Sequence, residues 1–314
     1  MKALWHISET ESKILPATDL LNADTIIAAQ YSLISMGTER LVANGNVPVS
    51  LYKTMAVPYM QGDFNFPIKY GYSLVGKVIE STVLPIGQLI HVMHPHQDIC
   101  SIHSNSTCNI PTTIPAKRAV LVANMETVIN AVWDAALLQK SIVLIAGYGT
   151  IGAMLARVCK QHYDCIVHVL EQDEDKKNVI IAHGYLLAKA DEMFDVAFNC
   201  SADEIALQYC IDNVKAEATV IELSWYGTKK ISISLGGSFH SMRKKIVASQ
   251  VAAIPLLQQK DWDFLKRKTF AFELLQDDFF DLLLTNEIIF GQSMDFFNNN
   301  RQSNLTGIGY YIRY

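Results

Sequence analysis

The middle of the chain alternates between short apolar runs and stretches in which apolar residues recur with helical spacing. The apolar runs predict buried strands at Ser141–Ala146, Cys165–Leu170, Phe194–Asn199, Thr219–Leu223 and Ile246–Ser249. The helical spacing predicts helices between them, at Thr150–His162, Lys176–His183 and Ala202–Val214. Strands that alternate with helices in this way form a parallel sheet covered on both faces. We therefore predict an α/β domain with a doubly wound parallel sheet.

The first 115 residues have a different pattern, in which short apolar runs are broken by Gly and Pro. Strands are predicted at Thr25–Ile34, Tyr72–Ser81 and Gln88–Met93, whereas the Ser-, Thr-, Asn- and Pro-rich segment Cys100–Pro115 is predicted to be a loop. The last residues, GIGYYIRY, predict a final strand. A short tail after an α/β domain often returns to complete the first domain. We predict a mostly β domain of residues 1–115, completed by about 262–314, and an α/β domain over 116–261.

Composition excludes several classes of function. The net charge of −5, from 26 basic and 31 acidic residues, disfavours a nucleic-acid partner. Six cysteines in 314 residues are too few for a disulfide scaffold and indicate reduced thiols in a cytoplasmic protein. The N-terminus lacks the apolar core of a signal peptide, and no apolar run approaches the ~20 residues of a membrane span. We expect neither export nor a membrane partner.

The strongest local signal is the hexapeptide GYGTIG, which fits G-x-G-x-x-G and directly follows a predicted strand. In such a loop Gly147 permits the tight turn, Gly149 lets the backbone approach a pyrophosphate, and Gly152 lets the helix pack closely on the strand. Thr150 and Ile151 begin the helix, whose free N–H groups and partial positive charge attract phosphate. The motif predicts dinucleotide binding.

An acidic residue follows the second strand of the same unit. Glu171 lies 19 residues beyond Gly152, close to the ~20 expected for the carboxylate that binds the ribose hydroxyls. Glu171 and Asp173 would repel a 2′-phosphate, so NAD is favoured over NADP. The alternative is a glycine loop that only packs a helix, but a strand, helix, strand and acid in register favour the dinucleotide site.

On these residues the chain resembles the medium-chain dehydrogenases/reductases, the superfamily of the zinc alcohol dehydrogenases. The resemblance extends over nearly the whole length. Its segments are YSLISMGTERL (31–41), KYGYSLVGKVIE (69–80), PIGQLIHVMHPHQD (85–98), AVLVANMETVINAVWDA (119–135), FDVAFNCSA (194–202) and VIELSWYG (220–227). The spacing of SxGTE and GYxxVG is most similar to a branch that includes the bacteriochlorophyllide-type hydroxyethyl dehydrogenases.

The resemblance implies a fold, an assembly and a set of cofactor contacts. A GroES-like catalytic domain would accompany a Rossmann nucleotide domain, with the active site in the cleft between them and a small-molecule substrate. The chain would form a homodimer or homotetramer. Cofactor contacts implied by the family pattern are Thr127 and Gln250. Ser224, at the end of the fifth predicted strand where open sheets bind ligands, and Ser201 are further predicted contacts. Glu126, unusual within an apolar helix, would either orient a polar group in the cleft or be solvated.

The resemblance also implies a catalytic zinc, but the residues at the ligand positions do not suit one. Catalytic zinc takes three ligands from Cys, His and carboxylates. The ligand positions are held here by Ser35 or Met36, by Tyr72 and Ser73, and in the third-ligand region by Ala123 and Asn130. We therefore expect no catalytic zinc. Cys100, His103 and Cys108 leave two interpretations open, a relocated metal or a polar loop with free thiols.

Without zinc, another group must polarise a carbonyl or accept the proton of an alcohol. His94 and His96 are the first candidates, because an unperturbed histidine titrates near pH 6.5. Thr38 stands where the family has a proton-relay hydroxyl, and the Tyr72 hydroxyl can donate to a carbonyl. For the histidines the alternative is an exposed loop, and for Tyr72 it is structural packing.

Three functions remain open. The first is an NAD(H)-dependent, zinc-independent oxidoreductase that transfers hydride between nicotinamide and an alcohol or carbonyl of a small organic molecule. The second is an NADPH-dependent quinone or enone reductase, which Glu171 disfavours. The third is a non-catalytic dinucleotide-binding protein that has lost the zinc site, since fold does not fix function. A zinc enzyme with shifted ligands is a further alternative.

Overall fold

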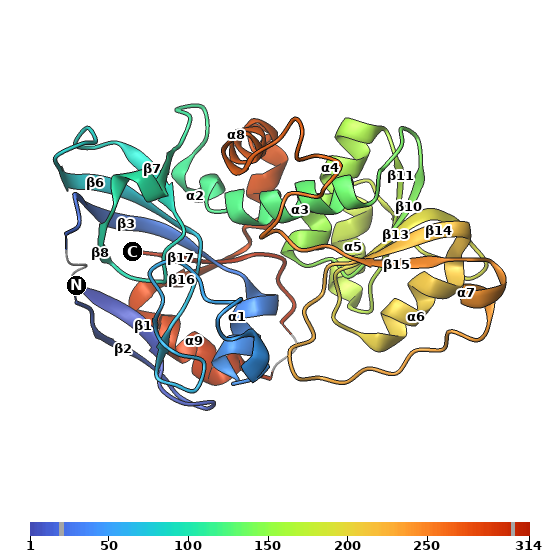
Figure 1. Cartoon of the computed structure of the whole chain (residues 1–314), viewed down its shortest axis with the longest axis horizontal. Helices are drawn as coiled ribbons and strands as arrows, with labels where there is room; N and C mark the ends of the chain where they lie inside the picture. Colours follow the sequence, from blue (N-terminus) through green and yellow to red (C-terminus); the bar gives the residue numbers. More distant parts are fainter. Residues whose placement is uncertain (19–21, 303–304) are drawn as a thin grey trace. The chain divides into compact units, whose positions relative to one another are not determined.

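The structure is a computed structural model that describes residues 1–18, 22–302 and 305–314. It divides into two compact units (Figure 1). The β unit comprises Met1–Ala123, Leu275–Leu305 and Gly309–Tyr314. The α/β unit comprises Asn124–Leu274 and Thr306–Ile308. The segment 262–274 therefore belongs to the α/β unit, not to the first domain as predicted, because its helix packs on that unit through buried ion pairs.

The α/β unit contains a six-stranded sheet in the order β12-β11-β10-β13-β14-β15, in which every neighbouring pair is parallel. The strands are β10 (Ile142–Ala146), β11 (Ile166–Leu170), β12 (Leu186–Leu187), β13 (Phe194–Asn199), β14 (Val214–Glu222) and β15 (Lys245–Ala248). The helices are α3 (Val122–Asp134), α4 (Thr150–Tyr163), α5 (Glu174–Ala182), α6 (Glu204–Asn213), α7 (Ser238–Ser241) and α8 (Phe264–Leu274). The predicted doubly wound parallel sheet is confirmed.

The helix starts of this unit follow from local chemistry. Asp173 accepts a hydrogen bond from the backbone N–H of Lys176 and so caps α5, and Asp203 caps α6 in the same way through Ala206. The apolar face of α6 then packs on the sheet, where Leu144, Phe194, Leu207, Ile211 and Val214 are among the buried residues of one core cluster. Burial of these side chains supplies the main stabilisation of the unit.

The β unit contains two sheets that are mostly antiparallel. One has the order β16-β17-β3-β6-β7-β9, with β8 also paired to β3, and the other has the order β2-β1-β5-β4. The strands are β1 (Lys2–His6), β2 (Ser12–Pro16), β3 (Thr25–Ile34), β4 (Gln61–Gly62), β5 (Ile68–Lys69), β6 (Leu74–Ser81), β7 (Leu89–Val92), β8 (Ile99–Ile102), β9 (Thr107–Asn109), β16 (Asn286–Ile289) and β17 (Tyr310–Arg313). The helices are α1 (Met36–Ala43), α2 (Ala116–Ala119) and α9 (Ser293–Asn300).

The C-terminal strand belongs to the first sheet. β17 pairs antiparallel with β3, with Tyr310 opposite Ile34, so the end of the chain lies beside a strand formed nearly 280 residues earlier. The predicted final strand is thus present. Cys100–Pro115 is not simply a loop, because it includes the end of β8 and all of β9, which pairs with β7. β9 has no apolar run of its own, so its pairing with β7 could not be predicted from the sequence.

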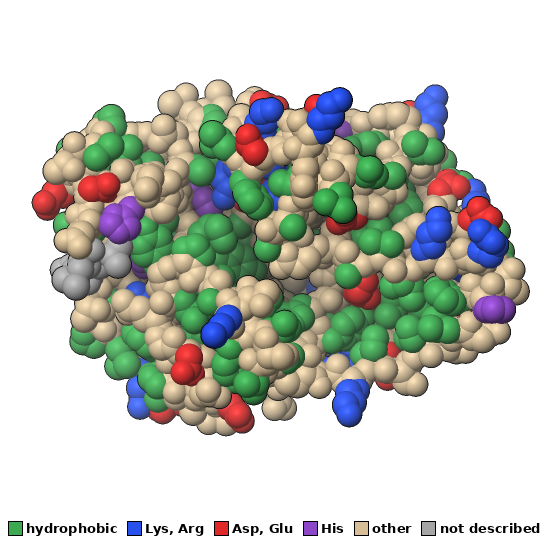
Figure 2. Space-filling model, in the orientation of Figure 1, with side chains coloured by type: hydrophobic (Ala, Val, Ile, Leu, Met, Phe, Trp, Pro, Cys, Tyr) green, Lys and Arg blue, Asp and Glu red, His purple; other side chains and the backbone are tan. Residues whose placement is uncertain are grey.

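Charged side chains of both signs are interspersed over the face shown in Figure 2, rather than gathered by sign. This distribution accords with the near balance of 26 basic and 31 acidic residues. Among the residues that the structure describes, none of the helices has the length and apolar character that crossing a membrane requires.

Candidate functional site

The glycine loop connects β10 to α4 at the carboxyl edge of the parallel sheet. Gly147 has φ +92°, a conformation that favours glycine, and a Cβ there would lie 3.2 Å from the Ser201 Cα. A Cβ on Gly152 would lie 2.0 Å from the Gly147 carbonyl oxygen, so the helix can pack here only with glycine. A Cβ on Gly149 would meet no atom within 4 Å, so the loop is open at this position.

The open position coincides with the start of α4. Gly149 is the N-cap and has no side chain to satisfy the N–H groups of the first turn, which includes Ile151. These groups and the dipole of a 14-residue helix suit an anion. The Thr150 hydroxyl donates to the Ile308 carbonyl at 2.8 Å, which leaves the backbone N–H of Thr150 as the group predicted to contact cofactor.

Glu171 lies at the end of β11, beside the glycine loop as the sequence predicts. Its carboxylate accepts hydrogen bonds from the backbone N–H of Tyr148 at 3.0 Å, of Gln172 at 2.8 Å and of Asp173 at 3.1 Å. The acid therefore ties the loop to the next strand. The sequence did not indicate that the Tyr148 ring is fully buried, with its hydroxyl 2.8 Å from His183 Nδ1.

A second polar cluster lies at the carboxyl ends of β13 and β14. The fully buried Asn199 donates from Nδ2 to Glu222 Oε2 at 2.8 Å, and its Oδ1 accepts from the Ser201 hydroxyl at 2.6 Å. Glu222 Oε1 accepts the backbone N–H of Ser224 at 2.7 Å. Burial, reinforced by Glu222, raises the pKa of the Tyr226 hydroxyl, which donates to the same carboxylate. The predicted Ser201 and Ser224 thus meet through residues that sequence reasoning missed.

The missed residues had a readable signal. Asn199 and Glu222 are the last residues of two buried parallel strands, where polar side chains meet at one edge of a sheet. Ser201 and Ser224, which follow these strands, were predicted as cofactor contacts. Asn199 and Glu222, which are the last residues of the strands, were not.

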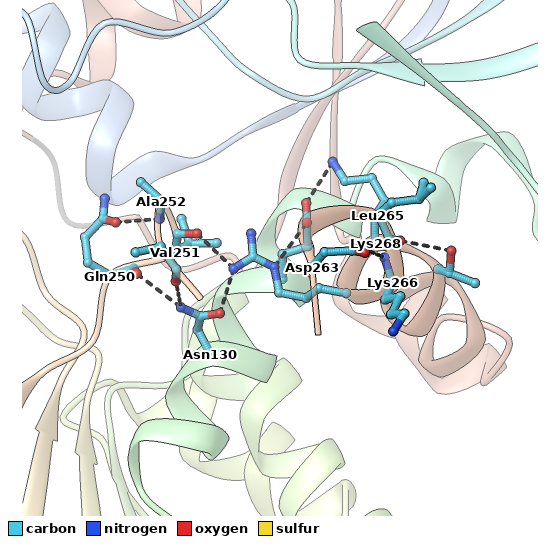
Figure 3. A network of polar contacts seen from close by, with 12 residues as sticks. Asn130, Gln250, Val251, Ala252, Asp263, Leu265, Lys266 and Lys268 are labelled. Atoms are coloured by element: carbon cyan, nitrogen blue, oxygen red, sulfur yellow. Dashed lines mark hydrogen bonds and ion pairs between the residues drawn. The ribbon is translucent and has the colours of Figure 1, made fainter. Parts of the chain in front are cut away.

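The remaining predicted cofactor contacts lie on α3 and after β15. Thr127 is partly exposed on α3, one turn before Asn130. Asn130 donates to the Gln250 carbonyl at 3.1 Å (Figure 3). Glu126 is 5% exposed and pairs with Arg267 at 3.2 Å and Lys268 at 2.8 Å, which excludes the solvated carboxylate, one of its two alternatives.

In the β unit, the polar side chains of Ser35, Thr38 and Tyr72 lie together at the start of α1. The side chains of Ser35 and Thr38 hydrogen-bond the Tyr72 hydroxyl, so two predicted catalytic residues are brought together. Burial, with a smaller contribution from the nearby Glu39 carboxylate, raises the pKa of Tyr72 to about 12. This hydroxyl therefore keeps its proton at neutral pH and is available as a hydrogen-bond donor.

His96 is fully buried and belongs to the same neighbourhood. Its Nε2 lies 2.7 Å from Glu39 Oε2, and its Nδ1 lies 2.7 Å from the Ser32 hydroxyl. Glu39 Oε1 accepts the backbone N–H of Ser35 at 2.8 Å. The alternative of an exposed loop histidine is excluded, because the ring is buried and both of its nitrogens have a partner.

His94 has hydrogen-bond partners outside this cluster. It is 2% exposed, and its Nδ1 is 2.8 Å from the Pro95 carbonyl oxygen and 3.6 Å from the Cys100 sulfur. Burial lowers the pKa of His94 to about 3, so the ring is neutral near pH 7. A neutral imidazole of this pKa is not an effective general acid near pH 7.

Two further features bear on where a ligand would bind. Within the described ranges no three His, Cys, Asp or Glu side chains are grouped to hold a metal ion, and Cys100 is buried in the core. A pocket of about 330 Å³ lies at the far end of α4, between Trp133, Tyr163 and Phe270. With a rise of ~1.5 Å per residue, it is separated from the glycine loop by most of the helix.

Comparison with known proteins gives the fold. Neither a protein-family model nor a curated protein matches the sequence. The 2R,3R-butanediol dehydrogenase of Bacillus subtilis has TM-score 0.78 at 13% identity, covering 100% of this chain and 99% of that chain. An E. coli alcohol dehydrogenase solved with NADH has TM-score 0.75 at 11% identity, with coverage of 100% and 99%. The yhdH oxidoreductase of Salmonella enterica, solved with NADP, has TM-score 0.70 at 13% identity, with 100% of both chains covered. The chain has the two-domain fold of the medium-chain dehydrogenases.

Proposed function

We propose that this chain is a nicotinamide-dinucleotide-dependent oxidoreductase that acts on an alcohol or carbonyl group of a small organic substrate. The observation that supports this most is the loop at Gly147–Gly152. Gly149 leaves open space at an uncapped helix start, while Glu171 lies beside the same loop. The likeness of fold to dehydrogenases crystallised with NADH or NADP supports the same class of ligand.

We further propose that NAD(H) is preferred and that no catalytic zinc takes part. A 2′-phosphate on the adenosine ribose would approach two carboxylates, Glu171 and the helix cap Asp173. Ser35, Tyr72 and Ser73 stand where the resemblance places zinc ligands, and their hydroxyls are already engaged in hydrogen bonds within the β unit. Hydroxyl groups of this kind are not ligands of catalytic zinc.

In this proposal the protein supplies position and a proton route. A bound nicotinamide supplies the hydride acceptor or donor. Tyr72 donates a hydrogen bond to the substrate oxygen and stabilises the negative charge that develops on it. The Ser35 and Thr38 hydroxyls hold the phenol in one orientation and exchange its proton. Glu39 and His96 touch no reacting atom and act as positioning residues.

The decisive experiment is a titration of the purified chain with NADH and with NADPH, followed by nucleotide fluorescence. We expect NADH to bind at least about tenfold more tightly, as repulsion of a 2′-phosphate by the two carboxylates requires. Gly149→Val should abolish binding, because a Cβ added there meets no protein atom within 4 Å and projects where phosphate would lie, while the less favourable N-cap should cost only about 1 kcal/mol of stability.

Gly236→Val is the matched control, because a Cβ there also meets no atom within 4 Å. It should bind NADH as the original chain does. Failure of the unaltered chain to bind any nicotinamide dinucleotide would overturn the proposed function. Tight binding with no turnover on a panel of carbonyls and alcohols would favour a non-catalytic nucleotide-binding protein.

A further inference from the structure

The segment that follows β15 is held in place by side chains from two helices (Figure 3). Asn130 of α3 donates from Nδ2 to the carbonyl oxygens of Gln250 at 3.1 Å and Ala253 at 2.7 Å. Arg267 of α8 donates from Nη1 to the Val251 carbonyl at 2.9 Å and to Asn130 Oδ1 at 2.6 Å. Three backbone carbonyls of one short segment are thus turned toward the helices.

The two side chains are themselves fixed. Asn130 is 1% exposed and Arg267 is 3% exposed. Glu126 accepts from Arg267 Nε at 3.2 Å and pairs with Lys268 at 2.8 Å. Asp263 caps α8 through the backbone N–H of Lys266, which places Arg267 in the first turn of the helix. A buried network in which each member has its partners specifies one arrangement.

The same segment also carries backbone hydrogen-bond donors. The backbone N–H of Ala252 donates a hydrogen bond to the side-chain oxygen of Gln250. The N–H groups of Gln250, Val251 and Ala253 have no partner among the residues that the structure describes. Because they are unpaired in the described part of the chain and the segment is largely exposed, these N–H groups are available to a ligand oxygen at the carboxyl end of β15.

The position of the segment in the sheet identifies the ligand. In doubly wound sheets a dinucleotide lies across the carboxyl ends of the strands, with one nucleotide on each side of the point where the strand order reverses. Here β10 and β11 lie on one side, with the glycine loop and Glu171, and β13, β14 and β15 lie on the other. Gln250–Ala253 is therefore on the side of the second nucleotide.

We propose that Asn130 and Arg267 are positioning residues that hold Gln250–Ala253 in the conformation that receives the second nucleotide of the cofactor. The inference rests on the proposed function. It differs from a purely structural role because it predicts a loss confined to one half of the ligand.

Asn130→Asp tests this directly. The carboxylate keeps an acceptor for Arg267 but replaces the donor to two carbonyls with an oxygen that repels them. The affinity of the variant for NADH should fall about tenfold, the size expected from the loss of buried hydrogen bonds. Its affinity for ADP, which has only the first nucleotide, should be unchanged. Both affinities are measured by calorimetry, beside thermal unfolding.

Lys244→Met is the matched control. Lys244 is 4% exposed and donates to the carbonyls of Ile211 at 2.8 Å and Asp212 at 2.9 Å, before the amino end of β15. Its loss removes similar buried contacts in the same unit, and NADH affinity should not change. The inference is overturned if Asn130→Asp binds NADH as tightly as the unaltered chain does. It is also overturned if the variant loses affinity for NADH and for ADP by the same factor. If the unaltered chain binds neither nucleotide, the proposed function fails first.

Discussion

At the scale of single residues, the surroundings of each candidate decide what it can do. Tyr72 and His94 were both predicted as groups that handle a proton. Burial raises the pKa of Tyr72 to about 12, which preserves a donor, and lowers the pKa of His94 to about 3, which removes an acid. The residue types were visible in the sequence, but the direction of each pKa shift depends on neighbours from other parts of the chain.

Tyr72→Phe is the prediction at this scale. Loss of the hydroxyl removes the donor to the substrate oxygen, so turnover should fall about a hundredfold or more, while NADH affinity stays within about twofold. Steady-state kinetics and nucleotide titration measure the two effects. Tyr52→Phe, which removes a hydroxyl bonded to Asn65 elsewhere in the β unit, is the control. A Tyr72→Phe enzyme with full turnover would contradict the assignment.

At the scale of elements, the strands and helices around the glycine loop could be predicted because their signals are local. β13 was predicted at its observed bounds, Phe194–Asn199, and α4 was predicted one residue short at its end. α9 was not predicted, and part of what holds it in place is distant in sequence; β1 and β2 pair with each other nearby and were simply missed. Asn298 of α9, for example, accepts the backbone N–H of Ser12 in β2.

Gly152→Ala is the prediction at this scale. A Cβ 2.0 Å from the Gly147 carbonyl oxygen forces α4 away from β10. We expect the variant to lose about 2 to 3 kcal/mol of unfolding free energy, as overpacked sites do. Urea denaturation measures the loss. Gly37→Ala, at a helical position with no atom within 4 Å, should be as stable as the original chain or more so.

At the scale of the whole molecule, the burial of titratable groups makes stability depend on pH. The β unit buries His6 and His94, and burial lowers the pKa of each to about 3. An unfolded histidine titrates near 6.5. The unfolded state therefore binds more protons between these values. The contribution of these histidines to the unfolding free energy is therefore fully present above pH 6.5 and declines as the pH falls toward 3.

Acid denaturation tests this account. Each buried histidine should lower the unfolding free energy by up to about 2 kcal/mol at pH 5 relative to neutral pH. In His94→Gln the difference between the unfolding free energies at pH 7.5 and pH 5 should be smaller. His240→Gln, at an exposed site, should leave that difference as it is. An unchanged pH dependence in His94→Gln would contradict the assigned burial.

The sequence by itself determined the parallel sheet, the glycine loop and the place of Glu171, because the spacing of apolar residues and glycines acts over a few neighbouring residues. Only the tertiary structure decided which polar groups meet. Glu39 contacts His96, which is 57 residues away in the sequence, and Asn130 hydrogen-bonds to Ala253, which is 123 residues away. Such contacts form when distant elements pack together, and burial then fixes the charge and orientation of the side chains. No local pattern encodes either.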